Sequence, residues 1–163
     1  MFVAPPFWYS LSVTVDIACG DEDFSDLCSL IGEFPELKVS LESGKFTVFA
    51  PNNKAFDVND RDWFGDQSKA ATKNMLMLHI VAGEKIEYDD LFCDDDEASD
   101  SNLIEMLNGK HTRTICDDTI PYGQKGPGNK GMVLFVDGRF IDGRTNIQAC
   151  NGVIHEIDGM LLD

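Results

Sequence analysis

Five cysteines and three histidines are the side chains of this sequence best suited to metal binding or nucleophilic catalysis. They are Cys19, Cys28, Cys93, Cys116, Cys150, His79, His111 and His155. No two cysteines form a C-x-x-C pair and the histidines are scattered, so the local spacing does not favour a zinc site. We therefore predict no metal site and no cofactor.

Disulfide bonding is the better interpretation of these cysteines. Cys93 and Cys116 bracket a strong hairpin signal, and closing that loop would stabilise the fold by roughly 3 kcal/mol. We predict a Cys93–Cys116 disulfide if the protein matures in an oxidising compartment. The alternative is five reduced cysteines that pack as small hydrophobic side chains. Because the number is odd, at least one cysteine is free or bonded to another chain, and the pairing of Cys19, Cys28 and Cys150 stays open.

Motifs of common catalytic sites are missing from the chain. There is no G-x-S-x-G, no glycine-rich phosphate loop after a strand and no H-E-x-x-H. Cysteine, histidine and aspartate do coexist, which leaves a Cys–His nucleophile pair in an unrecognised hydrolase as an alternative. We predict a binding module with no catalytic residues, and not an enzyme.

An acidic stretch at residues 89–100 carries seven carboxylates. Such a density of oxygen ligands could gather Ca²⁺, but the D-x-[DN]-x-[DN]-G spacing that wraps one ion is missing. We predict a solvated loop that condenses cations weakly. Its central residues, Asp94, Asp95 and Asp96, are candidates for binding a basic partner or Ca²⁺.

Length and charge limit the class of protein. A chain of 163 residues is long enough for one domain. With 13 Lys and Arg against 29 Asp and Glu, the net charge is −16, which repels nucleic acid and anionic membranes. No apolar run reaches the roughly 18 residues that a membrane-spanning helix needs. We predict that residues 1–12 are a tail and that 13–163 form the domain.

Helical patterns dominate the first half. In residues 21–31, Phe24, Leu27, Cys28 and Ile31 recur at helical spacing. A short helix is predicted in residues 34–44 with Gly44 as its end, and a helix in residues 67–81 passes into a strand near His79. Between them, "FTVFAPNNKAF" indicates a buried strand from Phe46, a turn, a cap at Asn52 and Asn53, and a short helix.

Strands and turns dominate the second half. Asn108-Gly109 predicts a type I′ hairpin turn, Asp137-Gly138 a second hairpin, and Asn151-Gly152 a turn or bulge. A Gly- and Pro-rich loop separates the first two. We therefore predict an α+β domain, with its helices concentrated in the first half and packed on a mostly antiparallel sheet.

Four motifs together resemble the fasciclin-like domain family. They are "TVDIACGDEDFSDLCSLI", "TVFAPNNKAF", "HIVAGEKI" and "NGVIHEIDGMLL", and the resemblance covers about residues 13–163. It implies a β-sandwich flanked by helices that is extracellular or at the cell surface. The implied function is adhesion or matrix interaction with an extracellular protein or glycan, without catalysis. It also implies that Thr47 and Asn53 tie a tight turn through side-chain to backbone hydrogen bonds.

The segment Leu78-His79-Ile80 occupies the place of a Tyr-His adhesion motif proposed for several fasciclin-like domains. This chain lacks the tyrosine, and with it the amphipathic anchor of such an interface. We expect His79 to be a partly buried histidine that satisfies backbone groups, with Leu78, His79 and Ile80 as the alternative binding edge. The Asp-Gly-Arg sequences at 137–139 and 142–144 are predicted to be turns.

Two further possibilities concern partners. The acidic loop could contact the loop carrying Lys125 and Lys130 in another copy, which would give weak self-association. The charge of −16 also supports an alternative function, an acidic structural protein associated with Ca²⁺ or mineral.

Overall fold

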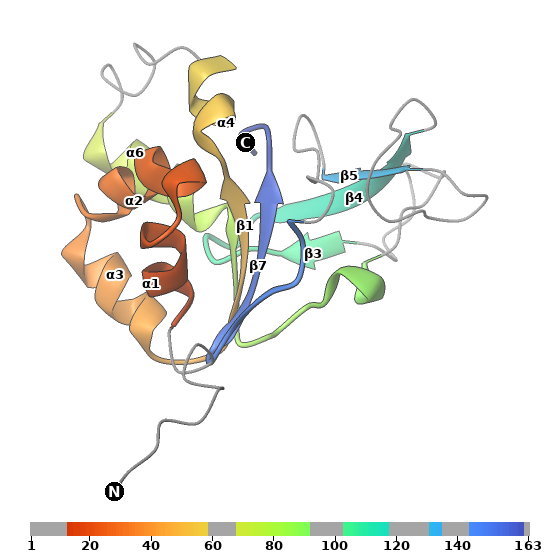
Figure 1. Ribbon diagram of the computed structural model, residues 1–163, viewed down its shortest axis with the longest axis horizontal. Helices are drawn as coiled ribbons and strands as arrows, with labels where there is room; N and C mark the ends of the chain where they lie inside the picture. The colour runs from red at the N-terminus through yellow and green to blue at the C-terminus, as the bar shows by residue number, and fades with distance from the viewer. Residues whose placement is uncertain (1–12, 59–67, 92–102, 118–130, 135–143, 162–163) are drawn as a thin grey trace, which may run out of the picture.

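The computed structural model describes residues 13–58, 68–91, 103–117, 131–134 and 144–161. Its helices gather on one side of two long neighbouring strands, β1 and β7, and a second, smaller sheet lies on the other side (Figure 1). The predicted tail at residues 1–12 lies outside the described residues. The architecture therefore has a helical layer, a central sheet and a further sheet.

The described α-helices all precede the strand β2, as the sequence predicts. They are α1 (Thr14–Cys19), α2 (Ser25–Ile31), α3 (Pro35–Glu42), α4 (Asn53–Val58) and α6 (Lys69–Met77), with a 3₁₀ turn, η2 (Glu22–Phe24), before α2. Side-chain caps start η2 and α6. Asp21 accepts from the backbone N–H of Asp23, and Ser68 accepts from that of Ala71, which satisfies donors that a helix start leaves unpaired.

The central sheet has the strand order β2-β1-β7-β6. Its strands are β1 (Phe46–Pro51), β2 (Ile80–Ala82), β6 (Ile147–Ala149) and β7 (Gly152–Ile157). The pairs β1–β2 and β6–β7 are antiparallel, whereas β1 and β7 run parallel. The predicted mostly antiparallel sheet is thus confirmed for its outer pairs, and its centre is a parallel pair between strands from opposite ends of the domain.

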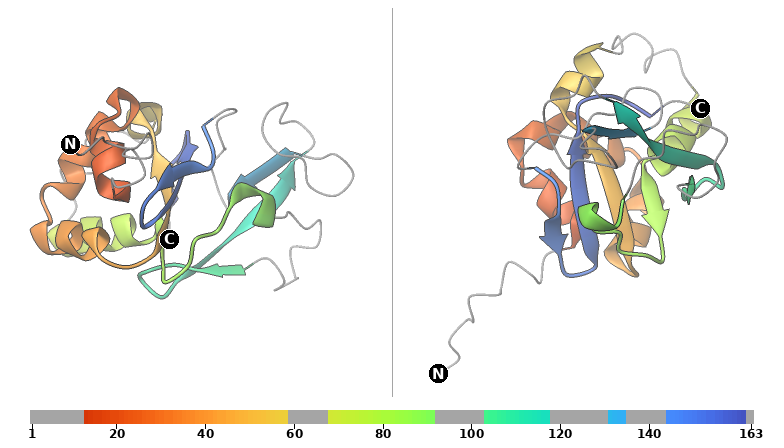
Figure 2. Two further views of the ribbon diagram at one scale, coloured as in Figure 1. Left: turned by 60° about the horizontal axis from the view of Figure 1, so that its bottom comes forward. Right: turned by 90° about the vertical axis from the view of Figure 1, so that its right-hand side faces the viewer.

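A second sheet, of order β3-β4-β5, is antiparallel throughout. It comprises β3 (Leu103–Glu105), β4 (His111–Asp117) and β5 (Gly131–Leu134). The two sheets are separate and do not close on each other (Figure 2). The predicted α+β class, with helices in the first half and strands later, is confirmed, and the term sandwich applies only loosely.

Hydrophobic side chains cover both faces of β1, whose residues are all buried. Phe46, Val48 and Ala50 belong to the core beneath the helices, together with side chains such as Leu27. Phe49 points the other way, into a second cluster formed by Phe49, Leu78, Val81, Tyr88, Leu91, Met106, Ile157 and Leu161. The buried strand predicted from Phe46 is therefore confirmed, with apolar contacts on both sides.

The hairpin at Asn108-Gly109 is present, but its turn differs from the predicted type I′. A type I′ turn requires positive φ at both central residues. Gly109 has φ 84°, but Asn108 does not have positive φ, since Asn146 is the one non-glycine residue with positive φ in the described ranges. The N–H of Gly109 bonds the carbonyl of Met106 at 2.8 Å, which fits a type I turn followed by a left-handed glycine. The side chain of Asn108 accepts from the N–H of Lys110 instead. The second predicted hairpin, at Asp137-Gly138, lies outside the described residues.

Gly152 lies where β7 begins, directly against β1. A Cβ added there would stand 1.8 Å from the carbonyl oxygen of Phe46. Backbone atoms cannot move away without breaking the β1–β7 pairing, so the position admits only glycine.

We expect Gly152→Ala to lower the free energy of unfolding by about 3–5 kcal/mol, because the new methyl group overlaps the backbone of β1. Urea denaturation monitored by circular dichroism measures the change. Gly32→Ala is the matched control, since a Cβ there meets its nearest atom at 3.4 Å, and it should change stability by less than about 1 kcal/mol. Equal effects of the two substitutions would contradict the assignment.

Candidate functional site

The predicted binding edge at residues 78–80 lies in the interior. Leu78, His79 and Ile80 are 4%, 2% and 3% exposed. They lie where α6 passes into β2, which is the helix-to-strand transition that the sequence predicts. A partner could not contact these side chains while the described core is intact. The segment is part of the fold's interior and not of its surface.

His79 uses both ring nitrogens to join distant backbone groups. Nδ1 lies 2.8 Å from the carbonyl of Met75, and Nε2 accepts from the N–H of Leu161 at 2.9 Å. A carbonyl can only accept and a backbone N–H can only donate, so the ring is neutral with its proton on Nδ1. Burial lowers the pKa of His79 to about 4, although the bond to Met75 opposes the shift. The expected satisfaction of backbone groups is observed, with fuller burial than expected.

A small cavity adjoins His79 between the helices and β1. Its volume is about 20 Å³, and its lining includes Thr14, Leu27, Val48 and His79. That is space for about one water molecule, which is too small for a substrate. Among the described residues that line it there is no cysteine, so this cavity does not bring together the Cys–His pair that a hydrolase would need.

Thr47 and Asn53 both make side-chain to backbone hydrogen bonds, but in separate places. Thr47 Oγ1 accepts from the N–H of Ile86 and donates to the carbonyl of Glu84, each at 2.8 Å. Asn53 accepts from the N–H of Asp26 and donates to the carbonyl of Glu22. The two residues therefore do not share one tight turn, because Thr47 faces the segment after β2 and Asn53 faces η2 and α2. Asn52 provides the cap at the turn, accepting from the N–H of Ala55.

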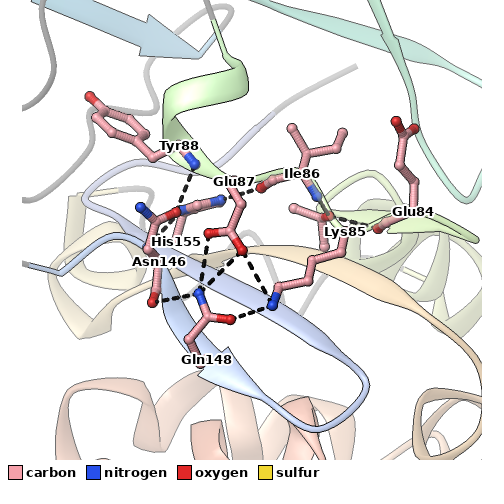
Figure 3. Close-up of polar contacts among 9 residues, drawn as sticks. Glu84, Lys85, Ile86, Glu87, Tyr88, Asn146, Gln148 and His155 are labelled. Carbon is pink, nitrogen blue, oxygen red and sulfur yellow. Dashed lines mark hydrogen bonds and ion pairs between the residues drawn. The ribbon is translucent and has the colours of Figure 1, made fainter.

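The segment after β2 crosses the central sheet and is held by polar groups of β1, β6 and β7 (Figure 3). We call residues 84–91 the strap. It includes the 3₁₀ turn η3 (Tyr88–Asp90). His155 of β7 bonds the strap through Nε2, which lies 2.8 Å from the carbonyl of Ile86. Its Nδ1 accepts from the N–H of Asn146 at 3.1 Å, and Asn146 Oδ1 accepts from the N–H of Tyr88 at 2.7 Å.

An exposed polar network covers the outer side of the strap. Lys85 pairs with Glu87 at 3.2 Å and also bonds Gln148 of β6, which contacts Glu87 in turn (Figure 3). Lys85 and Glu87 are each 36% exposed, so this pair contributes little to stability. These side chains are available to a partner, in contrast to Leu78, His79 and Ile80.

Arg144 and Glu156 form a clamp between β7 and the helical layer that sequence reasoning missed. Glu156 is only 5% exposed, and its carboxylate accepts from Arg144 at 2.5 Å and from Asn52 at 3.0 Å. Arg144 also pairs with Asp21 and lies over the ring of Phe24 at 5.7 Å. These hydrogen bonds raise the pKa of Arg144. The visible signal was a polar His-Glu pair inside the apolar run "VIHEI", which requires buried partners.

A disulfide joins Cys19 at the end of α1 to Cys28 in α2. The sequence left the pairing of these two cysteines open. The predicted bond between Cys93 and Cys116 is not tested, since Cys93 lies outside the described residues and only the backbone of Cys116, in β4, is described. Cys150 is exposed in the turn before β7. The bond found connects two helices that pack on the same core.

The acidic candidates Asp94, Asp95 and Asp96 lie outside the described residues. Asp90, at the start of the acidic stretch, is exposed. Within the described ranges, no three His, Cys, Asp or Glu side chains cluster as a metal site would require. Nor does any described helix combine the length and apolar character needed to cross a membrane.

Comparisons with known proteins agree with this arrangement. A family model described as "Fasciclin domain" matches residues 22–163. The chain belongs to the Fasciclin domain family. It is also 24% identical over 157 residues to "Protein sll1483" of Synechocystis sp., an alignment that covers 94% of this chain and 74% of that protein.

The fold of this Fasciclin domain is similar to a solved structure from an insect. That structure is a FAS1 domain pair from the cell adhesion molecule Fasciclin I, with a TM-score of 0.67 and 18% sequence identity. The match covers 93% of this chain and 51% of the insect chain, so this chain spans about half of the domain pair. At this identity the likeness concerns the fold alone.

The disulfide pattern of the Fasciclin domain can be read directly by mass spectrometry. Digestion without reduction should release a linked peptide containing Cys19 and Cys28. The same map tests the Cys93–Cys116 prediction, since those thiols should also resist alkylation if they are bonded. Alkylation of Cys19 and Cys28 in protein secreted through an oxidising compartment would contradict the observed pairing.

We expect Arg144→Ala to lower the free energy of unfolding by about 3 kcal/mol, because the buried Glu156 carboxylate loses its cationic partner. Chemical denaturation measures the loss. Lys73→Ala is the matched control. Its partner Glu36 is 64% exposed, so that pair should contribute less than about 1 kcal/mol. If Arg144→Ala were as mild as the control, the clamp would not be a stabilising element.

The neutral His79 makes stability depend on pH. The unfolded chain binds a proton at this residue below about pH 6.5, whereas the folded chain does so only near its pKa of about 4. The free energy of unfolding should therefore fall by about 1.4 kcal/mol per pH unit between these values. Denaturation at pH 7.5, 6.0 and 5.0 should show a shallower slope for His79→Gln than for the wild type. The exposed His111 provides the control, His111→Gln, and identical slopes in all three proteins would contradict the prediction.

Proposed function

We propose that the chain is a non-enzymatic adhesion or matrix-interaction module that acts outside the cell or at its surface. The observation that carries the proposal is the Fasciclin domain match over residues 22–163. Its partner is an extracellular protein or glycan that recognises exposed side chains of the domain. Weak association between copies of the chain is a further part of the proposal.

Two features of the structure support this assignment. The Cys19–Cys28 disulfide suits an oxidising compartment. The cavity beside His79 has space for about one water molecule, so a large partner cannot bind in it. The exposed pair Lys85 and Glu87, together with Gln148, offers a surface on the strap for such a partner.

An adhesion assay tests the proposal. Cells should attach to a surface coated with the folded chain. They should not attach to a surface coated with the same chain after reduction and denaturation. A second coating carries the triple variant Lys85→Ala, Glu87→Ala and Gln148→Ala. This variant should lose attachment if the strap surface binds, with an unchanged circular dichroism spectrum. Equal attachment to folded and denatured chain would overturn the proposed function.

An acidic structural role associated with Ca²⁺ or mineral is the second candidate, and the net charge of −16 favours it. Under this alternative the acidic stretch at residues 89–100 concentrates cations without wrapping a single ion. Calorimetric titration with Ca²⁺ separates the two candidates, because a plain adhesion domain should produce no saturable heat.

If the acidic stretch binds cations, replacing Asp94, Asp95 and Asp96 by Asn should weaken binding of Ca²⁺ or a basic partner. The thermal midpoint should stay nearly constant, since charges in a solvated loop add little to stability. A control with the same change of charge replaces the exposed Asp16, Glu33 and Glu42 by their amides. Equal affinity in both variants would mean that net charge, and not this stretch, governs binding.

A further inference from the structure

The strap covers one side of the second hydrophobic cluster. Tyr88 and Leu91 of the strap are 4% and 6% exposed and contribute directly to that cluster, and Ile86 packs against it. Removal of the strap would uncover a continuous apolar surface that includes Phe49 and Ile157. The contacts that hold the strap in place therefore determine whether this apolar surface is exposed to water.

Side chains of β1, of β7 and of the residue just before β6 bond backbone groups of the strap at three points. Thr47 of β1 bonds both Glu84 and Ile86, His155 of β7 bonds the carbonyl of Ile86, and Asn146 bonds the N–H of Tyr88. The strap is short of regular structure, with only η3 as a 3₁₀ turn. Its position rests on these side chains and on the burial of Tyr88 and Leu91.

His155 connects two of the three points. Its Nε2 faces a carbonyl, that of Ile86, and its Nδ1 faces a backbone N–H, that of Asn146. This environment accepts only the neutral ring with the proton on Nε2. Asn146 has the left-handed value φ 55°, a conformation that asparagine adopts more readily than most residues and that contacts with neighbouring groups stabilise further. The bond to His155 Nδ1 is one of those contacts.

We propose that His155 is an acid-sensitive latch that releases the strap when its ring becomes protonated. A proton on Nδ1 removes the acceptor for the N–H of Asn146 and sets two donors against each other. Asn146 then loses its fixed position, and Tyr88 loses its bond to Asn146 Oδ1. The strap separates from the sheet and exposes Tyr88 and Leu91, while the pairing of β1 with β7 persists.

The surroundings of the ring set the direction of the pH response. Phe49 of β1 lies 5.7 Å away between ring centroids, and Tyr88 of the strap lies 6.0 Å away. Burial lowers the pKa of His155, whereas the bond to the carbonyl of Ile86 and the nearby carboxylate of Glu87 raise it. Among the described residues, two further charged groups lie near the ring's surroundings. Lys85 pairs with Glu87 on the strap, and Glu156, the next residue on β7, faces the opposite side of the sheet and pairs with Arg144.

The sign follows from linkage. With the strap open, the ring binds a proton below about pH 6.5, whereas the latched ring binds it only at lower pH. The latched state is therefore fully favoured above about pH 6.5. Its equilibrium constant falls about tenfold per pH unit below that value until the latched ring itself titrates.

Amide hydrogen exchange measured from pH 7.5 to pH 5.0 tests the latch. After correction for the intrinsic exchange rates, the amides of Ile86 and Tyr88 should lose protection by about tenfold per pH unit below about 6.5. The amides of Phe49 and Asn52, which bond within the central core, should remain better protected at each pH. If the strap amides and the core amides had the same protection at every pH, the strap would open only when the whole domain unfolds. That result would overturn the proposal.

Three variants assign the response to one histidine. His155→Gln retains a donor and an acceptor but cannot titrate, so strap protection should become independent of pH over this range. His79→Gln and His111→Gln should keep the response of the wild type. Persistence of the pH response in His155→Gln, or its loss in His79→Gln, would overturn the assignment.

A measurement on the wild type serves if His155→Gln does not fold. Nuclear magnetic resonance titration of the His155 imidazole should give a midpoint at the pH where the loss of protection at Tyr88 levels off. A levelling-off at another pH would show that another group controls the strap, and the proposal would then be wrong.

Discussion

The parallel pairing of β1 with β7 is the constraint on which the remaining structure depends. Residues near positions 46 and 152 are brought together in register, and every residue of both strands is buried. Strands covered on both faces cannot leave a polar group without a partner, because the desolvation of an unpaired group costs about 1–3 kcal/mol. Each polar side chain on these strands therefore requires a particular segment to lie over it.

Three such side chains determine where the covering segments lie. Thr47 and His155 face the strap and fix its path across the sheet. Glu156 faces the helical side, where Arg144 and Asn52 neutralise and orient its carboxylate. Through Arg144 this carboxylate also reaches Asp21, just before η2. The polar groups of the central pair thus attach both layers to it, in addition to the hydrophobic contacts.

Local signals in the sequence account for much of the fold. Neighbouring residues are enough to predict the helical spacing around Phe24 and Leu27, the turn and cap at Asn52, and the transition near His79. The structure agrees with these predictions. The parallel β1–β7 pair could not be predicted from the sequence in the same way, because no local pattern records which distant strand completes a sheet. The Asn108 turn differs for a related reason. Its side chain bonds Asn74 of α6, a contact made only in the folded chain.

The candidate site was harder to predict than the fold. The sequence drew attention to His79, since it lies where a Tyr-His adhesion motif is proposed for several fasciclin-like domains. In the structure, however, His79 is interior and its bonds are satisfied. His155 is also buried. The hydrogen-bond partners of its ring are Ile86 and Asn146, which lie in two other segments of the chain. Its role depends on three separate segments meeting, which no spacing within "NGVIHEIDG" encodes.

The two histidines differ in what their neutral rings hold together. His79 links the end of α6 to the residues that follow β7, and both of these lie within the packed core. Loss of its bonds therefore acts on the stability of the whole domain. His155 instead links the core to a strap whose outer face carries exposed polar side chains. A proton at His155 consequently acts on the surface available to a partner, and a proton at His79 acts on whether the domain is folded.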